Sequence, residues 1–225
     1  MLIFCGLNNA CTNKIWHTFC HIKFEKLTTI SMNWETYIAL GDSITFGART
    51  YLGYPELVGS MLSTRLSKQW NVINCAVSGF KAIDLARHMD KHFMSLKEMD
   101  ASITSILIGT NDIKAQTTVS DFRIALDQVI LKAKLITQSN NVIILAIPRF
   151  HEGIAYPYSI GMNEMVAAYN AEIGFLSTRH NIRMLTLDHK KEDFLDGVHL
   201  NSYGITAFSS QISRYILQDK GIEVA

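Results

Sequence analysis

The sequence predicts a three-layer α/β domain, in which a parallel sheet lies between two layers of helices. From Met32 onward, short runs rich in aliphatic and β-branched residues alternate with longer segments of helical periodicity. Most of the short runs are apolar without interruption, which is typical of strands that helices cover on both faces. Because strand–helix–strand units cross over in a right-handed sense, this order of elements favours parallel strands.

Five runs are expected to form the strands. The first, at residues 36–40, reads TYIAL and leads directly into Gly-Asp-Ser. The other four follow it at residues 71–77, 103–108, 141–147 and 182–187. All five are aliphatic or β-branched through most of their length, as strands of a buried sheet are.

Two segments between and after these runs have the apolar stripe of an amphipathic helix. In residues 122–136 apolar side chains recur at steps of three and four, and Ser120 is placed to cap the helix start. Residues 205–216 repeat the pattern, with Asn201 or Ser202 as the cap. Three less regular segments are long enough for further helices: residues 54–66, 81–96 and 164–177.

The composition limits the class of protein. The chain has 225 residues, of which 48% are hydrophobic and 18% charged, so it is expected to form one globular domain. Its formal net charge of +1 argues against nucleic acid or an anionic membrane as a partner. Cys5, Cys11 and Cys20 lack the spacing of a zinc site, and Cys75 lies in an apolar run typical of a buried, reduced thiol.

The N-terminal stretch differs from the rest of the chain because it has no clear periodicity. We expect residues 1–31 to be a disordered extension or a start-site artefact, and residues 32–225 to be the single domain. The opening MLIFCGL is too short to span a membrane and no basic residue precedes it, so no transmembrane segment is predicted. The cytoplasm is the expected compartment, while secretion, lipid anchoring and the oligomeric state stay open.

Ligands of open α/β sheets bind beyond the carboxyl ends of the strands, so polar residues there are the site candidates. Ser43 follows the first strand, after Gly41, which permits a tight turn. A lone serine is more often a cap, since its hydroxyl is a weak nucleophile without a base. His199 in DGVH is the best candidate for that base, because Asp196 can accept from one ring nitrogen while the other faces the serine.

Acyl transfer also needs hydrogen-bond donors for the oxyanion. Asn111, in GTND after the third strand, offers two side-chain N–H donors, although asparagine is also a common turn residue. Gly79, after the second strand, can present its backbone N–H without a side chain in the way. The i,i+4 pair His88 and His92 has metal-pair spacing, but without a third ligand an exposed helical face is the simpler interpretation.

Four motifs together resemble the SGNH, or GDSL-type, hydrolases: GDSIT, the glycine after the second strand, GTND and DGVH. They occur in the order of that family's blocks and span the chain from Met32 to the C-terminal helix. Ile44 stands where the family name has leucine, and the second block is only a glycine in context.

This resemblance implies an esterase with a flavodoxin-like sheet of five parallel strands. It implies that Ser43 is the nucleophile, His199 the general base and then acid, and Asp196 the carboxylate that orients the histidine. The backbone N–H groups of Ser43 and Gly79 and the amide of Asn111 would form the oxyanion hole. The resemblance implies no metal or organic cofactor.

The substrates of the family include lysophospholipids, thioesters, aryl esters and acetylated sugars. We expect a small carboxylic ester, an acyl lipid or thioester among them, with carbohydrate O-acetyl esters as the alternative. Loops at 48–54, 80–83 and 149–157 would supply the pocket, and Arg149 and His151 could meet a polar leaving group. The candidates for substrate binding are Phe46, Tyr54, Phe80, Phe150 and His151.

Other classes of protein fit the sequence less well. A non-catalytic relative that binds an acylated or glycan ligand has no need to keep Ser43, Asp196 and His199. A flavodoxin-like nucleotide binder would need a glycine-rich phosphate loop, and the sequence has none of recognisable spacing. Asp42 and Asp112, beside the key residues, are expected to brace loops.

Overall fold

The structure, a computed structural model, describes residues 34–138, 141–154 and 156–222. The expectations for residues 1–31, including the three cysteines there, lie outside this part of the chain. Within it, the strands form one five-stranded sheet in the order β2-β1-β3-β4-β5, and every pairing is parallel. The strands are β1 (Trp34–Gly41), β2 (Gln69–Asn74), β3 (Ile103–Leu107), β4 (Val142–Leu145) and β5 (Arg183–Leu185).

The predicted α/β fold is confirmed, and each predicted strand is present with shifted ends. β2 shows the largest shift, since it ends at Asn74 although the apolar run continues to Val77. Beyond that end the Asn74 side chain accepts a hydrogen bond from Ala76 N, a local turn that interrupts the ladder. Cys75 N and Val77 N still donate to β1 carbonyls at 2.9 and 3.1 Å, so the chain stays close to β1 without forming a strand.

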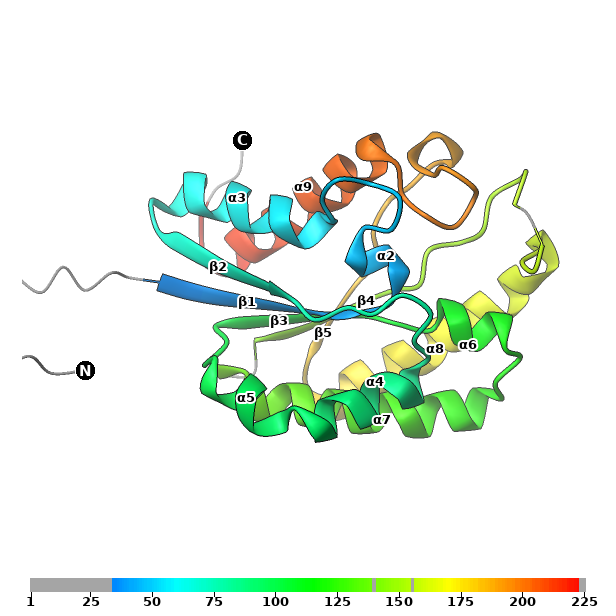
Figure 1. The fold of residues 1–225 in the computed structure, drawn as a ribbon, viewed down its shortest axis with the longest axis horizontal. Coiled ribbons are helices and arrows are strands. Elements are labelled where there is room, and N and C mark those ends of the chain that lie inside the picture. Colours follow the sequence, from blue (N-terminus) through cyan, green and yellow to red (C-terminus); the bar gives the residue numbers. More distant parts are fainter. Residues whose placement is uncertain (1–33, 139–140, 155, 223–225) are drawn as a thin grey trace, which may run out of the picture. The chain divides into compact units, whose positions relative to one another are not determined.

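The order of the strands determines where a site can form. β1 lies inside the sheet, and the chain leaves it first toward β2 on one side and later returns to β3 on the other. This reversal is a topological switch point, and ligands of open α/β sheets generally bind at such a point, beyond the carboxyl ends of the strands. The short helices α2 (Ser43–Phe46) and α6 (Thr110–Lys114) follow β1 and β3 and lie at this edge (Figure 1).

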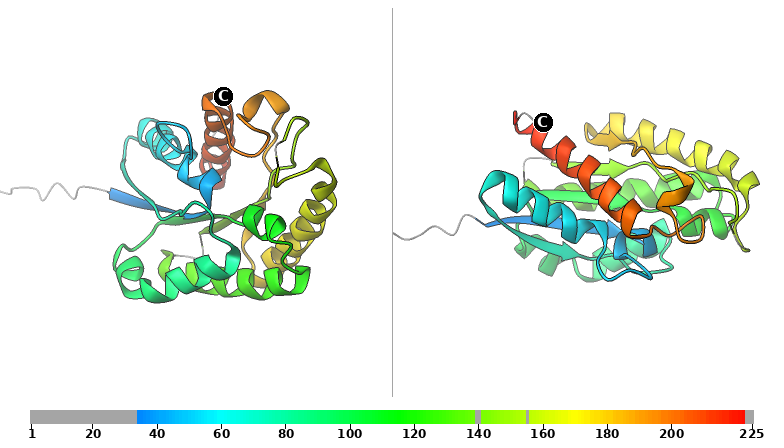
Figure 2. Two further views of the ribbon diagram at one scale, coloured as in Figure 1. Left: turned by 45° about the vertical axis from the view of Figure 1, so that its right-hand side comes forward. Right: turned by 90° about the horizontal axis from the view of Figure 1, so that it is seen from above.

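Two layers of helices cover the sheet (Figure 1). On one face α3 (Tyr54–Leu66) packs beside α9 (Ser202–Asp219), as Figure 2 shows from above. The other face carries α4 (Ala82–Lys91), α5 (Phe93–Glu98), α7 (Val119–Ile136) and α8 (Asn163–His180). The remaining helical turns are the 3-10 segments η2 (Ile160–Met162) and η3 (Lys191–Asp193).

The helix boundaries correct two expectations. Thr118, not Ser120, caps α7, because its Oγ1 accepts from Asp121 N at 3.1 Å and the helix starts one residue after it. The segment predicted as one helix over 81–96 breaks at His92, whose φ of −112° is not helical. Of the two caps predicted for α9, Asn201 is the one that forms: its Oδ1 accepts from the N–H groups of Tyr203 and Gly204.

The core consists of the side chains on both faces of the sheet and those on the apolar sides of the helices that cover it. Phe122 of α7 and Tyr169 of α8 are both fully buried, and their rings stack with centroids 4.0 Å apart. Cys75 is a free, half-buried thiol, and burial raises its pKa. Among the described helices, none is long and apolar enough to cross a membrane.

Candidate active site

Ser43 lies at a sharp turn between β1 and α2. Gly41 ends the strand, where an added Cβ would lie 2.3 Å from Thr45 Oγ1 and 2.4 Å from Leu107 O, so only glycine fits. Asp42 then caps α2, and its Oδ1 accepts from Ile44 N at 3.0 Å. Ser43 is therefore the first residue of the helix, a position whose backbone N–H has no partner within the helix.

The structure brings Ser43, His199 and Asp196 into one chain of hydrogen bonds. His199 Nε2 lies 3.0 Å from Ser43 Oγ, across 156 positions of sequence. His199 Nδ1 lies 2.8 Å from Asp196 Oδ2. Because a carboxylate can only accept, Nδ1 carries the proton and Nε2 is left to accept from the serine hydroxyl.

A tight loop holds Asp196 and His199 together. Leu195 N donates to His199 O at 2.7 Å and closes the loop. Inside it, Asp196 Oδ1 accepts from the backbone N–H groups of Val198 and His199 at 3.1 and 2.8 Å. The short D-x-x-H spacing thus allows one carboxylate oxygen of Asp196 to accept from the backbone of the same loop while the other faces the imidazole of His199.

The environment keeps Asp196 ionised. Burial alone would raise the pKa of Asp196, but the hydrogen bonds from His199 and from Val198 N–H outweigh it and lower the pKa. The same carboxylate has a partner that no sequence motif indicated: Arg49 Nη1 donates to Asp196 Oδ2 at 2.7 Å. Arg49 belongs to the loop between α2 and α3, and nothing in its local sequence marks this contact.

The two other expected oxyanion donors are Asn111, on α6, and Gly79, in the loop after β2, and α6 is bonded to that loop. Asn111 is 8% exposed on α6, and its Nδ2 donates to Phe80 O at 3.1 Å. The second hydrogen of the amide is left for another acceptor. Gly79 has φ +86°, a left-handed conformation that favours glycine, and an added Cβ there would meet nothing within 4 Å.

Asp42 and Asp112 are both buried and bind the starts of helices. Asp112 Oδ2 accepts from Ala82 N at 2.9 Å, at the first residue of α4. Burial, with a contribution from the charge of Asp112, raises the pKa of Asp42 to about 7. Burial likewise raises the pKa of Asp112 to about 6. These contacts agree with the expectation that the two acids brace loops.

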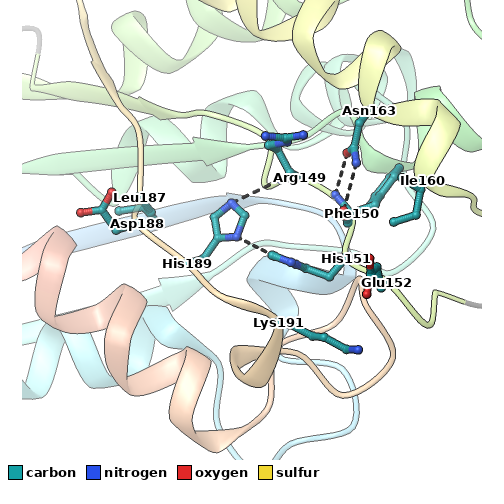
Figure 3. Close-up of a pocket in the computed structure, with 10 residues that line it drawn as sticks. All are labelled: Arg149, Phe150, His151, Glu152, Ile160, Asn163, Leu187, Asp188, His189 and Lys191. Carbon is teal, nitrogen blue, oxygen red and sulfur yellow. Dashed lines mark hydrogen bonds between the residues drawn. The ribbon is translucent and has the colours of Figure 1, made fainter.

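A cavity of about 570 Å³ opens between the loop after β4 and the segment after β5 (Figure 3). His151 and His189 face each other in it, with Nε2 and Nδ1 2.9 Å apart. His189 Nε2 accepts from Arg149 N at 3.3 Å, and burial followed by the nearby His151 lowers the pKa of His189. The residues that line the cavity are Arg149, Phe150, His151, Glu152, Ile160, Asn163, Leu187, Asp188, His189 and Lys191.

This cavity lies next to the hydrogen-bonded chain but is not lined by it. The ring of Phe194, just before the loop of Asp196, packs against His151 at 5.0 Å between centroids. The carbonyl of His151 lies 3.3 Å from where a Cβ of Gly197 would be. Phe150 and His151 therefore line a pocket that adjoins the base of the DGVH loop, and their role in substrate binding stays a prediction.

The three other aromatic candidates do not line this cavity. Tyr54 is fully buried and its hydroxyl bonds Thr45 Oγ1 at 3.1 Å, so it belongs to the core and the expectation that it lines a pocket is wrong. Phe46 is 55% exposed on α2, and Phe80 is half-buried with its ring 5.5 Å from that of His88. His92 is exposed, whereas His88 is partly covered by this contact.

Tyr158 is a neighbour of the site that the sequence did not indicate. Its ring packs against Phe150 with centroids 5.2 Å apart. Burial, together with the charges of Asp42 and Asp196, raises the pKa of Tyr158 to about 12. The Tyr158 phenol thus contacts a residue of the cavity wall and is influenced by the charges of both carboxylates.

The described residues contain no group of three or more His, Cys, Asp or Glu side chains that could hold a metal ion. The arrangement that they do contain is a serine hydroxyl bonded to an imidazole, which is bonded to a carboxylate. Such a chain can remove the hydroxyl proton and make the serine nucleophilic.

Residues 39–206 match the model of the GDSL-like lipase/acylhydrolase family. The chain belongs to this family. It is therefore an ester-hydrolysing enzyme, and the matched segment contains Ser43, Gly79, Asn111, Asp196 and His199.

Solved structures with the same fold include several members of this group of enzymes. A lipase/acylhydrolase from Enterococcus faecalis is 22% identical with a TM-score of 0.67, covering 82% of this chain and 96% of its own. The acetyl xylan esterase AlAXEase is 22% identical with a TM-score of 0.66, covering 80% and 99%. Axe2, an acetyl xylan esterase from Geobacillus stearothermophilus, is 19% identical with a TM-score of 0.61, covering 85% and 96%. No protein of curated function matches the chain.

Proposed function

We propose that the chain is a serine esterase that cleaves small carboxylic esters through an acyl-enzyme on Ser43. The observation that carries this proposal is the chain of hydrogen bonds from Ser43 Oγ through His199 to Asp196, with distances of 3.0 and 2.8 Å. A serine that only capped a helix would have no use for an imidazole oriented by an ionised carboxylate. The family membership supports the same reaction class.

The first half of the proposed reaction forms the acyl-enzyme. His199 Nε2 takes the proton of Ser43 as Oγ attacks the carbonyl carbon of the ester, and Asp196 stabilises the imidazolium that results. The backbone N–H groups of Ser43 and Gly79 and the amide of Asn111 would donate to the oxygen that becomes negative. The C–O bond to the alcohol then breaks, and His199 returns its proton to the leaving alcohol.

The second half repeats the same steps with water. His199 accepts a proton from water as the water oxygen attacks the acyl carbon, and the intermediate collapses with release of the carboxylic acid. Ser43 recovers its proton from Nε2, so the enzyme returns to its starting state.

A second candidate, a carbohydrate O-acetyl esterase, is favoured by the polar cavity beside the site. Its two cations, Arg149 and Lys191, are balanced by Glu152 and Asp188, so the cavity carries donors and acceptors without a large net charge. Sugar hydroxyls suit such a lining, and an acetyl group needs no long apolar channel. The similarity to two acetyl xylan esterases points the same way.

A single set of assays tests both candidates. Ser43→Ala should lower kcat/KM for a short aryl ester by roughly 10³-fold or more, because the nucleophile is lost, while the fold is kept. Ser60→Ala, at an exposed position on α3, is the matched control and should behave as wild type. The substrates are p-nitrophenyl esters of graded chain length, acetylated xylooligosaccharides and a lysophospholipid.

The outcomes separate the proposals. Turnover of acetylated sugars, with a steep loss of rate on p-nitrophenyl esters longer than the shortest, would support the O-acetyl esterase. Turnover of the lysophospholipid, with rates that rise with acyl chain length, would support an acyl-lipid substrate. Full activity in Ser43→Ala would refute the nucleophile. If the folded wild type neither hydrolyses any of these substrates nor reacts with a fluorophosphonate probe, the proposed acyl-enzyme on Ser43 is refuted.

A further inference from the structure

Arg49 is bonded to the carboxylate that orients His199. Its Nη1 donates to Asp196 Oδ2 at 2.7 Å, and the same oxygen lies 2.8 Å from His199 Nδ1. The other oxygen, Oδ1, already accepts from the backbone N–H groups of Val198 and His199. Arg49 thus supplies the fourth donor to Asp196, and it is the only one of the four that comes from outside residues 196–199.

The backbone around Arg49 is held in an unusual conformation. Arg49 has φ +69°, in the left-handed region that residues other than glycine rarely occupy. Thr50 fixes the turn, since its N and Oγ1 both donate to Gly47 O, at 3.1 and 2.7 Å. Such a conformation persists only where the surroundings enforce it, and it commonly occurs at functional positions.

The ion pair itself contributes little to the stability of the fold. The Arg49 side chain is 64% exposed and that of Asp196 is 25% exposed. Exposed pairs of this kind are screened by water and contribute roughly 0 to 1 kcal/mol. The bond therefore matters because it holds Asp196, the carboxylate that orients His199, and not because it stabilises the fold. Removal of Arg49 should leave the protein folded.

Resting on the proposed esterase function, we propose that Arg49 is a positioning residue for His199. Its guanidinium holds Asp196 in the orientation that presents Oδ2 to the imidazole, and its positive charge offsets the carboxylate charge beside the ring. The charged and titratable groups around this contact are Asp196 and His199 in the loop and Arg49 opposite them. Tyr158 is also near, because the charges of Asp196 and Asp42 both raise its pKa.

The charge of Arg49 makes a measurable difference to the pH profile. A cation beside Asp196 opposes the gain of a proton by the imidazole, so the neutral base persists to lower pH. Without Arg49 the carboxylate charge is not offset, and the acidic limb of kcat/KM should move to higher pH by roughly half a unit for a pair this exposed. The guanidinium charge is accessible to solvent, so salt should weaken its effect.

The experiment compares Arg49→Met and Arg49→Lys with wild type in the hydrolysis of a short aryl ester across pH at low and high salt. We expect Arg49→Met to shift the acidic limb of kcat/KM to higher pH and to lower kcat roughly two- to fivefold, with KM unchanged. Arg49→Lys keeps the charge and should keep the position of the limb. High salt should move the wild-type limb toward that of Arg49→Met and leave the limb of the mutant in place.

The control is Arg123→Met, because Arg123 is a 45% exposed arginine that pairs with Glu172 between α7 and α8. It should match wild type in both kcat and pH profile. The proposal is overturned if Arg49→Met, shown to be folded by circular dichroism, has the wild-type limb and kcat. It is equally overturned if Arg49→Lys shifts the limb as far as Arg49→Met, since the charge would then be irrelevant. Full activity of Ser43→Ala would instead refute the esterase mechanism on which this proposal rests.

Discussion

Asp196 illustrates how single residues define this site. One of its carboxylate oxygens accepts from the backbone N–H groups two and three residues further along its own loop, and the other binds the imidazole of His199. The first set of contacts follows from the D-x-x-H spacing. The contact from Arg49 does not, because it depends on where a separate loop passes. A carboxylate with four donors has little freedom to rotate, and that rigidity is what a base needs to stay aligned with its serine.

Asn111→Ala tests the proposed oxyanion donor. The substitution removes a side-chain amide that is 8% exposed and that also donates to Phe80 O. If the amide donates to the developing oxyanion, kcat for an aryl ester should fall by roughly 10²-fold or more, with little change in KM. Steady-state kinetics measure both constants.

The bond to Phe80 O also has a structural part, which a second measurement isolates. Urea unfolding of Asn111→Ala gives the free energy of folding that is lost with this bond, separately from the change in kcat. A fall of less than threefold in Asn111→Ala would exclude Asn111 as an oxyanion donor.

At the scale of secondary structure, the turn from β1 into α2 positions the nucleophile. The strand must end and a helix must begin within two residues, against the backbone of β3. Gly41 makes this possible because Leu107 O and Thr45 Oγ1 occupy the space of a Cβ. Asp42 caps the helix, and Ser43 follows at the first helical position. The loop that pairs Asp196 with His199 is equally compact, and its Gly197 has φ +81°.

Gly41→Ala and Gly174→Ala should have opposite effects on stability. At Gly41 the new methyl group would clash with a backbone carbonyl that cannot move, so the free energy of unfolding should fall by roughly 2 kcal/mol or more. At Gly174, inside α8, the nearest atom is Met184 Sδ at 3.7 Å, an ordinary contact. Alanine there should raise the free energy of unfolding by roughly 0.5 to 1 kcal/mol. Urea unfolding measures both, and equal effects would contradict the role of Gly41.

At the scale of the whole molecule, stability is linked to the buried acids Asp42 and Asp112. Both are at most 1% exposed, and each binds the start of a helix at the functional edge. Asp42 Oδ2, Asp112 Oδ1 and Thr110 Oγ1 have no hydrogen-bond partner within the described part of the chain. The pKa of Asp42 is raised from 3.8 to about 7 and that of Asp112 from 3.8 to about 6, so the folded protein binds protons that the unfolded chain releases.

The sign of the resulting pH dependence follows from this difference. Between pH 4 and 7 the folded state holds more protons than the unfolded state, so the contribution of these acids to the free energy of unfolding falls as pH rises. Asp42→Asn removes the larger of the two pH-dependent contributions to the free energy of unfolding. It keeps the cap of α2, since asparagine Oδ1 can still accept from Ile44 N. As pH rises from 4.5 to 7.5, the free energy of unfolding of the variant should therefore increase by roughly 2 to 4 kcal/mol relative to that of wild type.

Urea unfolding at several pH values measures this gain, with Asp90→Asn as the control because the Asp90 side chain is 63% exposed. Asp90→Asn should follow the wild-type curve. Parallel curves for wild type and Asp42→Asn would show that the buried carboxyl is not linked to folding in this range.

Much of the architecture was predictable because local pattern and global packing agree. Uninterrupted apolar runs identified the strands, since a strand covered on both faces has no polar side to reveal alternation. Their ends were less predictable: β2 stops at Asn74 because that side chain bonds Ala76 N, which competes with the sheet. The start of α7 was placed at Ser120 instead of Thr118, because both hydroxyls could cap and only the chain's path decides between them.

The sequence by itself determined the fold class, the family resemblance and the residues of the GDSIT, GTND and DGVH motifs, because their spacing is local and strand ends share one edge of a parallel sheet. Only the tertiary structure decided which side chains surround them. Tyr54 is core because α3 turns it inward, whereas Arg49 reaches Asp196 across 147 positions and Tyr158 packs on Phe150. These contacts join loops that are distant in sequence, and their geometry depends on how the elements pack.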